Sequence, residues 1–189
     1  MTSDQPDSGN RRTEVPFLTR LVATGLFVGY IPWASGTFGS LVGVLFYLIP
    51  GADDPPVLVA MILAGMVVGT TAAYRVAKAE GNRLAGTAEI TKRLFQPGST
   101  HSADPSIVVI DEIVGMWISL LWLPKTVIAI ALAFVLFRIM DVLKPEPAQM
   151  MERLPYGFGI MLDDVIAGIY ANLASHTILY ILTITIHSF

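Results

Sequence analysis

The chain has 189 residues, of which 53% are hydrophobic and 14% charged, and its mean hydropathy is +0.63. Ordinary soluble domains carry about a quarter charged residues, so this composition favours a small integral membrane protein. The absence of cysteine excludes disulfides, zinc–thiolate sites and a cysteine nucleophile. A net charge of −3 without a basic stripe argues against nucleic-acid binding.

The N-terminal residues divide into a polar tail and a short amphipathic segment. Residues 1–16 contain prolines and lack the apolar core of a signal peptide, which predicts a flexible cytoplasmic tail. Residues 17–30 are amphipathic but too short to span, so we expect an interfacial helix or an entry segment. Together these patterns predict a single membrane-embedded domain over residues 17–189.

The remaining apolar segments predict an all-α fold, a polytopic membrane helical bundle of about four to five membrane-associated helices. The first segment falls short of the ~20 residues that a straight spanning helix needs. Polar residues 81–105 are predicted to form a loop with at most one short helix. The stretch from KPEP to YGFG is expected to be a loop or a short interfacial helix. The predicted apolar segments are 37–49, 57–79, 106–123, 126–143 and 165–186.

Alternating spans bring the acidic motifs to one membrane surface. Asp111 lies 13 residues before Pro124, and Asp141 lies 17 residues after it. If Pro124 marks a tight turn, both carboxylates lie roughly 20–25 Å from it, at 1.5 Å per residue. Asp163 and Asp164 are expected to open the last span on the same surface. The small-residue stretch 31–40 opens the first span and, after two crossings, also shares that surface.

The basic residues identify this surface as the cytoplasmic one. With the predicted spans, Lys125 alone lies on the opposite side. This bias follows the positive-inside rule, so we expect a multi-pass protein of the bacterial inner membrane whose site faces the cytoplasm. The basic residues on the motif side are Arg11, Arg12, Arg20, Arg75, Lys78, Arg83, Lys92, Arg93, Arg138, Lys144 and Arg153.

The residue types at this surface are those of a phosphate and metal site. Hard oxygen ligands without histidine or cysteine favour Mg²⁺, with Mn²⁺ as the alternative ion. Arg138, Asp141 and Lys144 follow one another at intervals of three, which suits a phosphate held between a metal and cations. The small-residue stretches ASGTFGS and YGFG are expected to be loops whose backbone N–H groups approach phosphate. The five carboxylates are Asp111, Glu112, Asp141, Asp163 and Asp164.

Each feature also has a purely structural explanation. Asp163 and Asp164 can cap the last helix, because carboxylates complement a helix N-terminus. The two basic residues can be ordinary cytoplasmic anchors, and Asp111 and Glu112 can simply pair with Arg138. A single phosphate and metal site accounts for the convergence of all these residues, so we prefer it.

Three motifs resemble the bacterial phosphatidylglycerophosphatase A family and occur in the family's order. They are DEIVGMW at 111–117, FRIMDVLKPEP at 137–147 and GFGIMLDDVIAG at 157–168. IPWASGTFGS at 31–40 is similar to the family's N-terminal motif, although Ser35 stands where the family usually has proline. Tyr156 likewise stands where the family often has glycine. The resemblance covers roughly residues 30–175.

The resemblance implies a Mg²⁺-dependent membrane enzyme that hydrolyses the terminal phosphate monoester of phosphatidylglycerophosphate. The products would be phosphatidylglycerol, an anionic phospholipid, and inorganic phosphate. The family's acidic motif residues fall on the five carboxylates, which are therefore expected to be catalytic. The metal ligands are expected to be Asp111, Glu112, Asp141 and Asp164. The substrate phosphate is expected to contact Arg138, Lys144, Thr37 and Ser40.

Two chemical routes and one other class of function remain open at this stage. The metal can activate a water, or one carboxylate can act as a covalent nucleophile. The main alternative is a cation- or proton-coupled small transporter that uses the same carboxylates. The clustering of the acids at one surface and the absence of an inverted repeat disfavour it. The motifs of CDP-lipid transferases and of histidine-dependent lipid phosphatases are absent.

Overall fold

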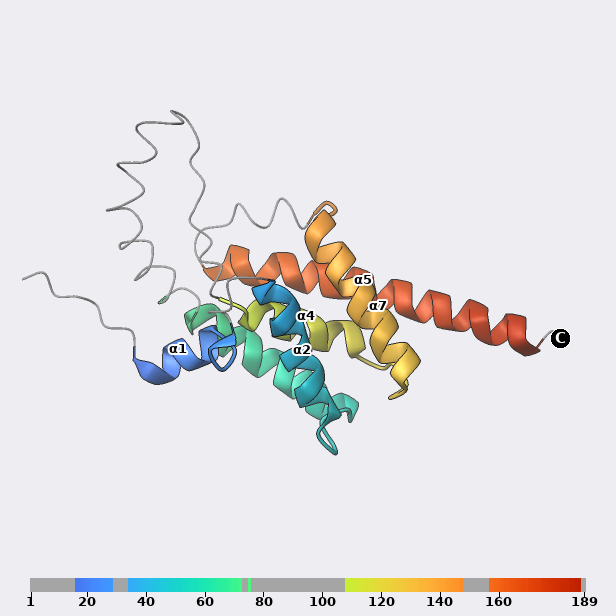
Figure 1. The fold of residues 1–189 in the computed structure, drawn as a ribbon, viewed down its shortest axis with the longest axis horizontal. Coiled ribbons are helices and arrows are strands. Elements are labelled where there is room, and N and C mark those ends of the chain that lie inside the picture. The colour runs from blue at the N-terminus through green and yellow to red at the C-terminus, as the bar shows by residue number, and fades with distance from the viewer. Residues whose placement is uncertain (1–15, 29–33, 73–74, 76–107, 148–156, 188–189) are drawn as a thin grey trace, which may run out of the picture.

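A computed structural model describes residues 16–28, 34–72, 75, 108–147 and 157–187, which form helices and the turns between them (Figure 1). No strand occurs in these ranges, so the predicted all-α class is confirmed. The predicted tail, the polar 81–105 stretch and residues 148–156 lie outside the described residues. The helices are α1 (Phe17–Ala23), α2 (Ser35–Leu48), Pro55–Ala72, α4 (Ile110–Leu120), α5 (Val127–Leu143) and α7 (Gly157–His187).

Two helices are long and apolar enough to cross a membrane: Pro55–Ala72 and the part of α7 from Met161 to Ile186. By contrast, α2 has 14 residues and α4 has 11. At 1.5 Å per residue, α4 extends only about 16 Å, roughly half of the hydrocarbon thickness. The four-to-five-span bundle therefore does not follow from helix length alone.

Helix boundaries differ from the predicted ones at three functional stretches. The third apolar segment forms a helix only over α4, because Leu121 is extended and Trp122 has a φ of 61°. The expected loop ASGTFGS is instead the start of α2, preceded by Ala34 in the left-handed conformation. The glycines of YGFG belong to the first turn of α7.

Because α7 begins at Gly157, Asp163 and Asp164 lie about two turns inside the helix. The alternative that they cap a helix is therefore wrong, whereas they do lie in the first turn of the candidate span from Met161 to Ile186, as expected. Helix N-caps and first-turn acids act within the first turn only. Their position inside α7 needs another explanation.

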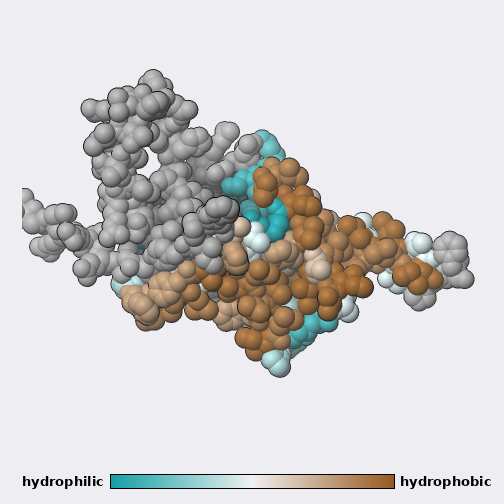
Figure 2. Space-filling view, in the orientation of Figure 1, coloured by the Kyte–Doolittle hydropathy of each residue, from teal (hydrophilic) through white to brown (hydrophobic). Residues whose placement is uncertain are grey.

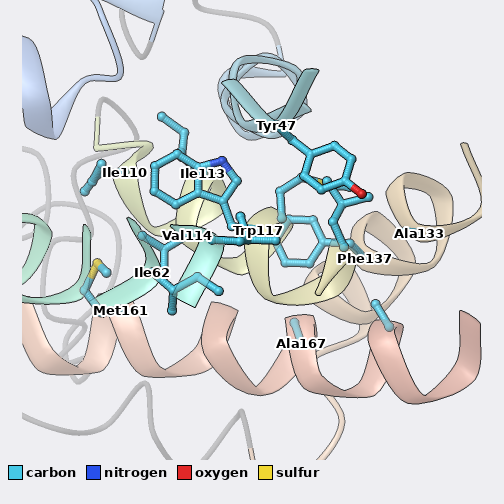
Figure 3. Packing of buried hydrophobic residues seen from close by; sticks show 14 of the residues in the cluster. Tyr47, Ile62, Ile110, Ile113, Val114, Trp117, Ala133, Phe137, Met161 and Ala167 are labelled. Atoms are coloured by element: carbon cyan, nitrogen blue, oxygen red, sulfur yellow. The ribbon is translucent and has the colours of Figure 1, made fainter. Parts of the chain in front are cut away.

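The short helix α4 is the centre of the fold, in contact with α2, α5 and α7 (Figure 3). Nine of its eleven residues are buried. Trp117 and Phe137 pack in the core with Val114, while Met161 contributes from α7. Burying aromatic and branched side chains yields roughly 1.5–3 kcal/mol each relative to exposure, so this cluster holds the helices together.

Polar contacts also hold α4 to its neighbours. The Trp117 indole N–H donates to the Gly43 carbonyl of α2 at 3.0 Å. At the other end of α4, the Asn172 side chain of α7 donates to the carbonyls of Ser119 and Leu121, at 3.1 and 2.8 Å. These carbonyls lie at a helix C-terminus and have no intrahelical partner, so Asn172 caps α4. The register of α4 against α2 and α7 is thus set by directional bonds as well as by packing.

The outer surface is largely apolar, with hydrophilic residues gathered in patches near its upper and lower edges on the face shown in Figure 2. The exposed hydrophobic side chains come from several helices, and Val127 of α5 is 84% exposed. Soluble proteins rarely expose contiguous apolar areas of this kind, whereas a lipid environment favours them. This surface agrees with the membrane class that the composition predicts.

Candidate active site

Two glycines set the crossing of α4 and α7. A Cβ at Gly168 would lie 2.5 Å from the Gly115 carbonyl oxygen. A Cβ at Gly115 would lie 2.8 Å from the Asp164 carbonyl oxygen and 2.6 Å from the Phe137 ring. Neither position has room for a side chain, so the two backbones approach as closely as small-residue helix crossings in membranes do.

The crossing brings carboxylates of the two helices together. Asp111 and Asp164 each lie four residues, about one turn, before the crossing glycine of their own helix. Together with Glu112, they have carboxylate oxygens that all lie within 4.8 Å of one another. Asp111 and Asp164 are 8% and 4% exposed, and the Glu112 Oε2 atom is buried with no hydrogen-bond partner among the described residues.

Arg138 and Asp141 form a second part of the site on α5. The Arg138 Nη1 atom lies 2.7 Å from Asp141 Oδ2, and it also donates to the Ser40 hydroxyl at 3.5 Å. Ser40 is fully buried, and its own hydroxyl donates to the Gly36 carbonyl at 2.9 Å. Asp141 is close enough to Glu112 and Asp164 for electrostatic interaction with both. The second part therefore adjoins the acidic cluster.

The first turn of α2 approaches the site through a glycine that the sequence analysis did not single out. A Cβ at Gly36 would lie 2.6 Å from Glu112 Oε1 and 3.0 Å from Arg138 Nη1. The absence of a side chain at Gly36 thus makes room for both charged groups. The signal was present in the N-terminal motif, but a glycine there does not reveal which side chains it will face.

Lys144 and Asp163 form a separate pair, with Lys144 Nζ 2.8 Å from Asp163 Oδ2. Lys144 ends α5 in a left-handed conformation, with a φ of 43°, which directs the chain away from the helix. Asp163 is not among the three acids whose oxygens converge, although it directly precedes Asp164. The two adjacent aspartates therefore have different neighbours.

The central cluster gathers several carboxylates in a small volume. Asp111, Glu112 and Asp164 converge, and Asp141 beside them forms an ion pair with Arg138. Ionised carboxylates this close together repel strongly at low dielectric, unless protons or a cation compensate. The oxygen-only donor set and the unpartnered Glu112 oxygen suit a hard divalent cation.

The structure brings together most of the residues that the motifs identify. Asp111, Glu112 and Asp164 form the cluster, whereas Asp141, predicted to be a metal ligand, pairs with Arg138. Thr37 lies with Arg138 along a groove between α2 and α5. Which of these residues acts in catalysis remains a prediction.

Comparison with known proteins bears directly on these motifs. The family model for phosphatidylglycerophosphatase A matches residues 91–179, which include α4, α5 and both aspartates of α7. Phosphatidylglycerophosphatase A of Escherichia coli is 31% identical over 79% of this chain and 76% of its own length. The Haemophilus influenzae protein of the same name is 35% identical over 85% and 88%, respectively.

The chain belongs to the phosphatidylglycerophosphatase A family. It is accordingly a phosphatase, as the motifs imply, and the transporter alternative is not favoured. A Bacteroides thetaiotaomicron protein called “Putative phosphatidylinositol-3-phosphatase” is also similar, at 34% identity over 82% of this chain and 89% of its own. No solved structure shows significant similarity to the chain.

Proposed function

We propose that this protein hydrolyses the terminal phosphate monoester of phosphatidylglycerophosphate to phosphatidylglycerol and inorganic phosphate, in a Mg²⁺-dependent reaction. The observation that carries the proposal is the convergence of Asp111, Glu112 and Asp164 beside Arg138 in a chain of this family. Carboxylates for a hard cation and a guanidinium for phosphate are the two components that phosphomonoester hydrolysis needs.

The ion would be held by Asp111, Glu112 and Asp164. A magnesium ion bound there would supply Lewis-acid polarisation of the phosphate and activation of a water. Oxygen ligands favour Mg²⁺ and Mn²⁺ over zinc, which supports the choice of ion. Asp141 adjoins this set and has a second role, because its ion pair with Arg138 orients the guanidinium.

Arg138 binds the substrate phosphate in this proposal. Both of its described polar contacts use Nη1, and no acceptor for its other N–H groups occurs among the described residues. A guanidinium has five N–H donors, so Arg138 can bind phosphate while it stays paired with Asp141. The first-turn amides of α2, beside Gly36, lack intrahelical acceptors and add favourable dipoles for an anion.

Lys144 and Asp163 support the phosphate site from one side. The 2.8 Å ion pair fixes the Lys144 ammonium at the end of α5, two residues past the groove residue Val142. An ammonium held there adds positive charge for the phosphoryl group, and Asp163 keeps it in place. Asp163 is thus a positioning residue, whereas Asp164 belongs to the metal set.

The arrangement in the membrane is part of the proposal. We infer four to five membrane-associated helices in one domain over 17–189, with the acidic cluster at the cytoplasmic face of the bacterial inner membrane. The apolar surface and the basic residues of the sequence support this orientation. Because the chain has no cysteine, single substitutions T126C and E146C can test it. An impermeant thiol reagent added outside should label the first and not the second.

The test of the activity is phosphate release by the purified protein in mixed micelles of phosphatidylglycerophosphate, with Mg²⁺ or with EDTA. We expect release with Mg²⁺ and none with EDTA. Phosphatidylinositol 3-phosphate is the second substrate, because one similar protein carries a name for it. Faster hydrolysis of the inositol lipid would replace the proposed substrate, and release of phosphate from neither lipid would contradict the proposal.

A further inference from the structure

A groove runs between α2 and α5 on the outer surface of the protein. Its volume is about 520 Å³, and it is lined by Thr37 and by one face of α5 from Phe134 to Leu143. Most of the lining side chains are apolar, while Arg138 and Thr37 supply its polar groups. We propose that this groove, the α2–α5 groove, holds an acyl chain of the phospholipid whose phosphate binds Arg138.

The first support is that the groove leads into the acidic site. Arg138 lines the groove and, at the same time, pairs with Asp141 and adjoins Gly36 and Glu112. A phosphate bound by the N–H groups of Arg138 that have no described partner would therefore lie beside the carboxylates and at one wall of the groove. In phosphatidylglycerophosphate, a glycerol, a phosphodiester and a second glycerol separate the terminal phosphate from the acyl chains, so a chain can reach the apolar side chains of α5 from a phosphate at Arg138.

The second support is the match in size and polarity. The ten residues from Phe134 to Leu143 span about 14 Å along the helix axis. The hydrocarbon core is about 30 Å thick, so a chain of one leaflet extends over about 15 Å. Val135, Ile139 and Val142 are 52%, 43% and 73% exposed and present an apolar surface to this space. Arg138 lies between these apolar side chains, so charge and apolar surface share one face of α5, as binding of an anionic lipid requires.

The inference rests on the proposed function and extends it to how the lipid is recognised. It predicts that the groove contributes to binding of substrates with acyl chains, whereas the phosphate and carboxylate groups act on any substrate with the same head group. The groove should then have no effect on hydrolysis of the same head group without its acyl chains. This difference separates the groove from the rest of the site.

The test fills the groove with a larger side chain and compares two substrates. We expect Ile139→Trp to lower kcat/KM for long-chain phosphatidylglycerophosphate at least about tenfold, through KM, since about two methylene contacts are worth that factor. Hydrolysis of the acyl-free head group should be unchanged. Ile169→Trp on α7 is the matched control, because Ile169 is 44% exposed, against 43% for Ile139, and lies outside the groove. A second variant, Val135→Trp, repeats the test at another groove position.

An unchanged kcat/KM for the long-chain lipid in both groove variants would overturn the inference. An equal loss for both substrates would also overturn it, since the groove would then act on the phosphate site alone. A readout without catalysis completes the test: phosphatidylglycerophosphate with a photoreactive acyl chain should label an α5 peptide of the wild type and of Ile169→Trp. Labelling should be lost in Ile139→Trp. Two outcomes would show that something else occupies the groove: labelling confined to other helices, or crosslinks between two copies of the protein through α5. This readout does not depend on hydrolysis, so it holds even if the protein hydrolyses no lipid.

Discussion

The two ends of the helical core both carry charged residues, but among the described residues buried carboxylates converge at only one of them. At the turn end, Lys125 Nζ lies 2.7 Å from Asp53 and 5.6 Å from the centre of the Tyr47 ring. The side chains of this ion pair are each about one-third exposed. At the site end, the oxygens of Asp111, Glu112 and Asp164 converge beside the Arg138–Asp141 pair, and Asp111 and Asp164 are nearly inaccessible.

This difference separates a structural contact from a site. An exposed pair of opposite charges links two turns, contributes little to stability and needs nothing else. Buried acids in excess are costly unless a cation or a proton compensates them, so evolution toward stability alone would replace them. The convergence of buried carboxylates at the site end is therefore an arrangement that could hold a cation, and the turn end supplies controls within the same molecule.

The largest expected effect comes from Asp164→Asn. The change removes one charge from the converging carboxylates while keeping the shape of the side chain. We expect phosphate release to fall more than about 100-fold. Even substitution of residues that only orient metal ligands lowers metal affinity or activity about 10–100-fold. Circular dichroism and elution volume should match the wild type. Activity within a factor of two of the wild type would exclude Asp164 from the site.

Gly36→Ala should damage the site without removing any charge. The new Cβ would lie 2.6 Å from Glu112 Oε1 and 3.0 Å from Arg138, so at least one of the two groups must move. A displacement of about 1 Å can cost 10²-fold in rate. Alanine is the better helix former, by up to about 1 kcal/mol, so helix propensity offers no reason for unfolding.

Gly51→Ala at the turn end is the control for Gly36→Ala. A Cβ there has nothing within 4 Å, but its φ of 85° is unfavourable for alanine. We expect this variant to lose about 1–2 kcal/mol of stability and to keep its activity. The opposite pattern, with Gly36→Ala fully active and Gly51→Ala inactive, would contradict the location of the site.

Asp163→Asn should have a smaller effect than Asp164→Asn, although the two residues are adjacent. Asp163 holds Lys144, and Lys144 is proposed to act on phosphate, so the loss should be that of a positioning residue, about 10–100-fold. Lys144→Met should cause a loss of similar size. Because each change breaks the same ion pair, the double variant should lose no more activity than the single variant with the larger loss. Additive losses in kcat/KM would show that Asp163 acts independently of Lys144.

The smallest effect is expected at the turn end, from Asp53→Asn. Its contact with Lys125 should leave phosphate release unchanged. The hydrogen bond from Lys125 lowers the pKa of the Asp53 carboxyl. The pair therefore contributes stability above the unfolded-state pKa of about 3.9, and this contribution is lost as pH falls through the lower folded-state pKa. Thermal unfolding should show a small difference from the wild type at neutral pH that disappears in acid.

Much of the fold and the composition of the site are predictable from sequence, for identifiable reasons. A continuous apolar run bounded by Thr126 and Lys144 predicts α5 almost to the residue. The residue types and motif order predict which acids gather at one end. The short length of α4 was not predictable, because its apolar run continues past Leu120, and only the backbone turn at Trp122 ends the helix.

The different neighbours of Asp163 and Asp164 were also beyond sequence reasoning. Adjacent residues point about 100° apart on a helix, so the rotation of α7 decides which one faces α4. That rotation depends on the close contact of Gly168 with Gly115, which joins segments far apart in the chain. Gly36 was missed for the same reason, because its role depends on side chains of α4 and α5.

The central claim is that the converging carboxylates of α4 and α7 hold a divalent cation, and Mn²⁺ binding tests it most directly. Titration of the purified protein with Mn²⁺, followed by electron paramagnetic resonance of the free ion, needs no substrate. We expect saturable binding by the wild type and by Asp53→Asn, competition by Mg²⁺, and binding at least about tenfold weaker in Asp164→Asn. Binding by Asp164→Asn with wild-type affinity, or no binding by the wild type, would contradict the account.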